Sequence, residues 1–131
     1  MIKPNTSQTT RVLLAEDDET NIQVILAYLS ALPTLELTVV KDGRAALETA
    51  TVNLYELMIF DQNMPFITGD RIIRHLQASG SINAHTPVIR LSADTTQTKD
   101  ASAGSSRNIH LSKPLRQNEL IDTIKLLLTN I

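Results

Sequence analysis

The sequence predicts an α/β fold in which a doubly wound, five-stranded parallel sheet is covered by five helices. Two features indicate this fold. Short apolar runs alternate along the chain with segments whose apolar residues recur at helical spacing. The most apolar run, Leu57 to Phe60, has no polar alternation. Such a run is typical of a strand buried on both faces of a helix-covered parallel sheet.

Five runs have the composition and the boundaries of strands. Most are rich in β-branched or other apolar residues, and turn-forming or charged residues follow them. The last run is short and partly polar, so we expect its strand to be weak. In chain order the runs are Arg11–Ala15, Leu35–Val40, Glu56–Phe60, Thr86–Ser92 and Asn108–Leu111.

A predicted helix follows each predicted strand. Apolar residues at i, i+3, i+4 and i+7 mark the first helix, which Asp18 is placed to cap and Pro33 ends. A turn over Lys41–Gly43 precedes the second helix, and the third ends near Gly80. The fourth falls in a polar stretch and should be short and poorly packed. The helical segments are Ile22–Leu29, Arg44–Ala50, Ile72–Leu76, Asp94–Ser106 and Leu120–Leu128.

The composition is that of one globular domain, with 131 residues, 42% of them hydrophobic and 20% charged. We expect the domain over residues 11–131, behind a polar tail or linker over residues 1–10. The absence of cysteine excludes disulfides and thiolate metal sites. A net charge of −2 and few aromatic residues argue against direct nucleic-acid binding. Without a long apolar run or a signal peptide, we expect no membrane segment and a cytoplasmic location.

Several polar residues fall at the ends of predicted strands. In open α/β sheets, ligands bind beyond the carboxyl ends of the strands, where the strand order reverses. In the flavodoxin-like order 2-1-3-4-5, that point lies between the first and third strands. The predicted pocket there holds Glu16, Asp17, Asp61, Ser92 and Lys113.

These residue types together suit metal-assisted phosphoryl chemistry. Three neighbouring carboxylates repel one another, and oxygen ligands without His or Cys indicate Mg²⁺ or a similar hard ion. Lys113 and the Ser92 hydroxyl suit the oxygens of a phosphoryl group, and Asp61 could be the nucleophile that forms an aspartyl phosphate. Each residue alone is typical of an ordinary turn or helix cap, so the prediction depends on their combination.

Four motifs resemble the receiver domain of two-component response regulators: "VLLAEDDETN", "MIFDQNMPFITGD", "TPVIRLSAD" and "HLSKPL". The resemblance extends from about Arg11 onward, and the first and last motifs look most like receivers attached to hybrid sensor histidine kinases. It implies a phosphoacceptor domain of a two-component phosphorelay, in which phosphorylation switches partner interactions. The implied partner is a sensor histidine kinase or a histidine phosphotransfer domain. The domain would catalyse only its own phosphorylation and dephosphorylation.

The resemblance implies a role for each residue of the phosphorylation site. Asp61 would accept the phosphoryl group from a phosphohistidine. Asp17 would bind Mg²⁺ directly and Glu16 largely through water, while the backbone carbonyl of Asn63 would supply a further ligand. Gly69 matches the family glycine in the turn after the phosphorylation site.

The resemblance also implies how the activated state is recognised. Ser92 would bind a phosphoryl oxygen, Lys113 would contact the phosphoryl group or Asp61, and the Lys113–Pro114 bond would be cis. His110 occupies the switch position, where the family has an aromatic residue.

Three further features depart from the family pattern or have no assigned role. Arg90 stands inside the fourth strand, where a side chain reaching past the sheet margin is the favoured interpretation. An ion pair near the pocket or a partner surface is the alternative. The stretch between Gly104 and Lys113 is about two residues longer than usual in the family. His75 and His85 lack ligand-like spacing and are expected on the surface.

Two other functions remain open at this point. A phosphohydrolase with an aspartate nucleophile needs a second acid two residues later, where this chain has Asn63. A pseudo-receiver that only binds partners would lack a site residue, yet the acidic pair, Asp61 and Lys113 are all present. No nucleotide-binding glycine motif occurs. The sequence also leaves open a homodimer, and whether the chain is a stand-alone regulator or a piece of a hybrid kinase.

Overall fold

The computed structural model describes residues 9–93 and 108–128 of the chain. Its strands form one parallel sheet in the order β2-β1-β3-β4-β5, which confirms the predicted fold class and strand order. The strands are β1 (Thr10–Ala15), β2 (Leu35–Val40), β3 (Leu57–Asp61), β4 (Val88–Ser92) and β5 (Asn108–Ser112). The helices in these ranges are α1 (Glu19–Leu29), α2 (Gly43–Val52), α3 (Gly69–Ala78) and α4 (Gln117–Leu127). The fourth helix expected from the sequence lies outside the described residues.

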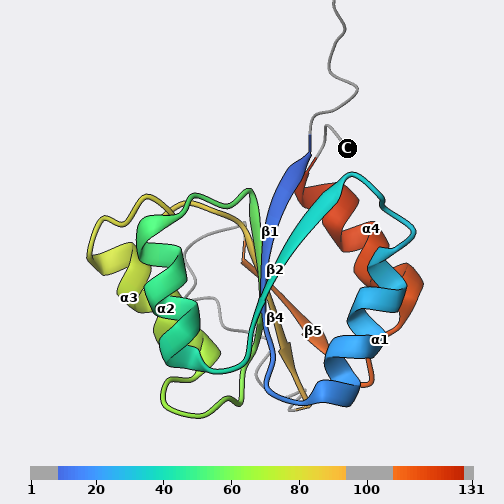
Figure 1. Cartoon of the computed structure of the whole chain (residues 1–131), viewed down its shortest axis with the longest axis horizontal. Helices are drawn as coiled ribbons and strands as arrows, with labels where there is room; N and C mark the ends of the chain where they lie inside the picture. The colour runs from blue at the N-terminus through green and yellow to red at the C-terminus, as the bar shows by residue number, and fades with distance from the viewer. Residues whose placement is uncertain (1–8, 94–107, 129–131) are drawn as a thin grey trace, which may run out of the picture.

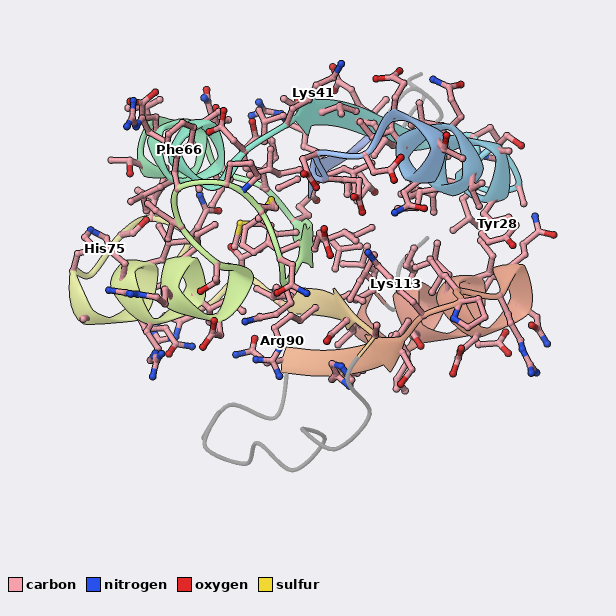
Figure 2. The ribbon with its side chains drawn as sticks, turned by 90° about the horizontal axis from the view of Figure 1, so that it is seen from below. Tyr28, Lys41, Phe66, His75, Arg90 and Lys113 are labelled. Atoms are coloured by element: carbon pink, nitrogen blue, oxygen red, sulfur yellow. The ribbon has the colours of Figure 1, made fainter. Side chains whose placement is uncertain are left out.

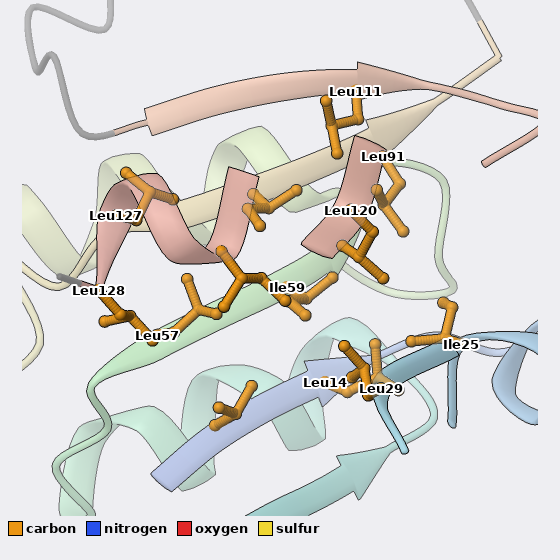
Figure 3. Packing of buried hydrophobic residues seen from close by; sticks show 13 residues of the cluster. Leu14, Ile25, Leu29, Leu57, Ile59, Leu91, Leu111, Leu120, Leu127 and Leu128 are labelled. Atoms are coloured by element: carbon orange, nitrogen blue, oxygen red, sulfur yellow. The ribbon is translucent and has the colours of Figure 1, made fainter. Parts of the chain in front are cut away.

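Helices cover both faces of the sheet (Figure 1). α2 and α3 lie on one face, and α1 and α4 lie on the other. Because successive strand residues point to opposite faces, Leu57 and Ile59 of β3 pack toward α1 and α4 (Figure 3), whereas Met58 and Phe60 pack toward α2 and α3. All four side chains are at most 1% exposed. The run without polar alternation is therefore buried on both faces, as predicted.

Two strands begin later than the sequence indicated, for local reasons. β4 starts at Val88 and not at Thr86, because Pro87 has no N–H for the ladder and the Thr86 hydroxyl donates to a backbone carbonyl before the strand begins. β3 starts at Leu57, one residue after Glu56, whose carboxylate accepts a hydrogen bond from the first part of β1.

Aspartates cap the starts of α1 and α2. Asp18 accepts hydrogen bonds from the N–H groups of Thr20 at 2.8 Å and Asn21 at 3.4 Å, which confirms it as the cap of α1. Asp42 caps α2 in the same way, so the helix already begins at Gly43, a residue expected in the preceding turn. None of the described helices has both the length and the apolar character needed to cross a membrane.

Candidate functional site

An acidic cluster lies at the carboxyl edge of the sheet, between β1 and β3. Asp61 is the last residue of β3 and is 3% exposed, while Glu16, directly after β1, is fully buried. Asp17 lies on the solvent side. One carboxylate oxygen from each of the three lies within 4.8 Å of the others. The sequence analysis expected Glu16, Asp17 and Asp61 in one pocket at this edge of the sheet, and the fold places their carboxylates close together.

Lys113 reaches into this cluster from the segment between β5 and α4. Its Nζ lies 3.0 Å from Asp61 Oδ1 and 3.8 Å from Glu16 Oε1. Its backbone N–H donates to the carbonyl of Ser92 at 3.0 Å, which joins the segment to the end of β4. The peptide bond between Lys113 and Pro114 is cis. Figure 2, which looks onto this edge of the sheet, places the Lys113 side chain near its centre.

Glu16 is the most constrained acid of the cluster. Its Oε2 accepts a hydrogen bond from the Asp18 N–H at 3.2 Å, but its buried Oε1 has no hydrogen-bond partner among the described residues. Burial raises the pKa of Glu16 above its ordinary value and the negative charge of Asp61 raises it further, outweighing the opposing effects of the Asp18 N–H, Lys113 and Asn21. A buried oxygen with no donor is suited to a cation.

The charges of the site fit a hard divalent ion. Three carboxylates stand against one ammonium group, which leaves an excess of two negative charges when all are ionised. Every candidate ligand is an oxygen, the donor that Mg²⁺ prefers, and Mg²⁺ usually retains several waters. The exposed side of Asp17 leaves room for such waters.

The backbone after Asp61 is held by close packing against the start of α3. Gly69 is buried there, and a Cβ on it would lie 2.9 Å from the carbonyl oxygen of Asp61, so a larger residue would push the end of β3 aside. The Gly69 N–H donates to the Gln62 carbonyl at 3.0 Å. Gln62 and Asp70 exchange two hydrogen bonds, of 2.7 and 3.0 Å, and the Thr68 hydroxyl donates to Asp70 at 2.8 Å. We call Gln62, Thr68 and Asp70 the loop clamp.

The loop clamp was missed by the sequence reasoning. Its only sequence signals are a glutamine next to Asp61 and an aspartate in the first turn of a helix, and neither is specific. Burial alone would raise the pKa of Asp70, but hydrogen bonds from Gln62 and Thr68, together with Arg74 and Arg90, outweigh burial and lower it. The clamp aspartate is therefore held in its charged form.

The remaining predicted residues lie on and beyond the neighbouring strands. Ser92 ends β4 and is 5% exposed. Asn63 is exposed in the loop after β3. His110 is half-buried on β5, directly opposite Arg90 of β4, which in turn lies opposite Phe60 of β3. His75 and His85, in contrast, are exposed, as expected.

Arg90 lies on an inner strand of the sheet. β4 lies between β3 and β5 in the sheet, and Arg90 is half-buried there. Its charge helps to lower the pKa of Asp70. Both interpretations of Arg90, a side chain that extends past the sheet margin and a charged partner near the pocket, stay predictions.

Among curated proteins, one relative is the autoinducer 2 sensor kinase/phosphatase LuxQ of Vibrio parahaemolyticus. It is 29% identical over 114 residues, which is 86% of this chain but only 13% of the length of LuxQ. The chain thus spans a small part of that relative.

Solved receiver domains have the same fold. The Francisella response regulator 1452 receiver domain is 31% identical, with a TM-score of 0.78 over 91% of this chain and 96% of that one. The receiver domain of sensor histidine kinase PA1611 from Pseudomonas aeruginosa PAO1 is 27% identical, with a TM-score of 0.79 over 93% of this chain and 99% of that one. The latter structure has a magnesium ion coordinated in its active-site cleft.

The family model for the response regulator receiver domain matches residues 12–125. This range includes the whole sheet from Val12 onward, the acidic cluster and Lys113. By sequence, by fold and by the arrangement at the carboxyl edge of its sheet, this chain belongs to the response regulator receiver domain family of two-component systems.

Proposed function

We propose that this chain is the phosphoacceptor of a two-component phosphorelay and that Asp61 receives the phosphoryl group from a phosphohistidine. The donor would be a sensor histidine kinase or a histidine phosphotransfer domain. One observation supports this most strongly: Asp61 is nearly buried, yet it lies 3.0 Å from the Lys113 ammonium and within 4.8 Å of the Glu16 and Asp17 carboxylates.

In the proposed reaction, an Asp61 carboxylate oxygen attacks phosphorus while the phosphorus–nitrogen bond of the donor histidine breaks. The donor imidazole leaves with the bonding electron pair, and an acyl phosphate forms on Asp61. Glu16, Asp17, Asp61 and the Asn63 carbonyl would hold Mg²⁺, which when bound neutralises charge on the phosphoryl oxygens.

The chain's own polar groups would stabilise the product. The Lys113 ammonium already lies beside Asp61 and would attract a phosphoryl oxygen, and the Ser92 hydroxyl would donate a hydrogen bond to another. Because Asp61 and Ser92 are buried, these interactions would be stronger than in bulk solvent.

The test is phosphorylation by acetyl phosphate or by a phosphohistidine donor in Mg²⁺. Asp61→Asn should abolish the hydroxylamine-labile label, because the amide cannot accept a phosphoryl group. Asp122→Asn, on the exposed side of α4, is the matched control and should be labelled normally. Undiminished labelling of Asp61→Asn would refute the assignment.

A further inference from the structure

A groove outside the phosphorylation site lies between α2 and α3. Its volume is about 580 Å³, and it is lined by Leu47, Phe66, Ile67, Arg71, Arg74 and His75. Figure 2 shows Phe66 and His75 on one side of the molecule, away from Lys113. Nothing in the proposed phosphotransfer uses this groove.

The groove is basic although the chain is acidic overall. Arg71, Arg74 and His75 recur at i, i+3 and i+4, so they share one face of α3. Arg44 of α2 lies over the Phe66 ring, 4.4 Å from its centre. In the described part of the chain, Arg74 pairs with Asp70 at 3.2 Å, whereas Arg44 and Arg71 form no ion pair. The net charge of the chain is −2, so the charge of this surface is opposite in sign to the net charge of the chain.

Phe66 is held in a strained and exposed position. Its φ of 73° is in the left-handed region, which is costly for a residue with a side chain. The Ile67 N–H donates to the Pro65 carbonyl at 2.9 Å, which closes a tight three-residue turn around Phe66. The Gly43 N–H also donates to Pro65, at 3.1 Å, and a Cβ on Gly43 would collide with the Ile67 backbone. The start of α2 thus fixes a turn that leaves Phe66 67% exposed.

An exposed aromatic ring beside arginines is the composition of a protein-binding hot spot. A small ligand is a poor fit, because ligand pockets bury most of their ligand, and here the Arg74 side chain is 71% and Phe66 67% exposed. Arginine recognises carboxylates through two parallel hydrogen bonds. We propose that this groove docks an acidic segment of a partner protein, with an apolar side chain against Phe66 and Leu47 and carboxylates on Arg71 and Arg74.

The test is NMR titration of the ¹⁵N-labelled chain with short peptides that combine aspartate and glutamate with leucine, at both helical and extended spacing. The backbone amides of residues 66–75 should shift, and peptides with glutamine in place of the acids should have little effect. Arg71→Glu should weaken binding by about fivefold or more, because it replaces an attraction by a repulsion. Phe66→Asn should also weaken binding, since asparagine accepts the left-handed backbone but lacks the apolar ring.

Lys125→Glu is the matched charge reversal on the exposed side of α4. An equal loss of affinity in Lys125→Glu and Arg71→Glu, or no amide shifts with any acidic peptide, would overturn the proposal. Shifts of the same amides caused only by anionic vesicles, or by raising the concentration of the chain alone, would instead identify a membrane surface or a second copy. Phosphorylation of Arg71→Glu by acetyl phosphate should be normal, so this test is independent of the role of Asp61.

Discussion

Replacing Glu16 by glutamine should stabilise the metal-free protein and at the same time weaken its response to Mg²⁺. Glu16 is fully buried, and its Oε1 has no hydrogen-bond partner among the described residues. At an effective dielectric constant of about 20, the Lys113 ammonium at 3.8 Å attracts this carboxylate by about 4.4 kcal/mol, and each carboxylate within 4.8 Å repels it by at least about 3.5 kcal/mol. Asp17 and Asp61 both lie within that distance, so the repulsion exceeds the attraction.

The cost of removing the charge from water acts in the same direction as this net repulsion. That cost is several kcal/mol for a buried ion, and a buried glutamine amide still costs about 1–3 kcal/mol. We expect Glu16→Gln to raise the free energy of unfolding by about 1–2 kcal/mol in the absence of metal. In Mg²⁺ the wild-type protein should gain stability because the folded state binds the ion. The variant should gain less because it lacks one ligand.

The raised pKa of Glu16 makes the stability of the metal-free protein depend on pH in a definite direction. The pKa of Glu16 in the folded state is raised above its ordinary value of 4.5. Its protonated form thus stabilises the folded state fully below about pH 4.5, and this contribution is lost as the pH rises through the folded-state pKa. In metal-free buffer, Glu16→Gln should remove this decline.

Urea unfolding followed by circular dichroism, in EDTA and in Mg²⁺, measures each of these quantities. Glu48→Gln, on the exposed side of α2, is the matched control and should change stability by less than about 0.5 kcal/mol. The electrostatic account of this site would be wrong if Glu16→Gln were less stable than the wild type in EDTA. It would also be wrong if Mg²⁺ raised the unfolding free energy of the variant as much as that of the wild type.

Three other changes probe the rest of the site. Asp17→Ala should remove Mg²⁺ binding and phosphorylation together, measured by metal titration and acetyl phosphate labelling; normal labelling would show that the ion is held elsewhere. Lys113→Ala should still unfold cooperatively, because the Lys113 side chain is 28% exposed and water can replace the ammonium, but the NMR spectrum of the variant should respond less to a beryllofluoride phosphate mimic. Gly69→Ala should cost about 1–3 kcal/mol, since its Cβ would lie 2.9 Å from the Asp61 carbonyl, and an unchanged unfolding midpoint would contradict the close packing.

The sequence predicted the residues that lie at strand ends and missed those that depend on the path of a loop. Asp61, Glu16 and Lys113 could be placed because parallel strands end at one edge of a sheet, whatever the loops between them do. Gln62 and Asp70 meet only because the chain turns back at Gly69, and periodicity carries no information about that turn.

Charged residues inside strands were also difficult to interpret from the sequence. Arg90 interrupts an otherwise apolar strand, and the pattern alone favoured a side chain that escapes to the sheet margin. In the fold it is half-buried on β4, and its charge contributes to lowering the pKa of Asp70. Asp70 lies in the first turn of α3, and the sequence pattern does not reveal this interaction.

The apolar strand and its terminal carboxylate belong to the same physical arrangement. The proposed phosphoacceptor role requires a carboxylate that is held in a fixed position and partly removed from water, and removing a charge from water destabilises a protein. The four side chains from Leu57 to Phe60 are at most 1% exposed, and each contributes about 1.5–3 kcal/mol through burial. That burial outweighs the cost of a buried charge at the end of the strand, and it fixes the strand from which Asp61 projects. β3 is apolar because it lies between β1 and β4 under helices on both faces, and the same burial fixes the strand that ends on Asp61 beside Glu16.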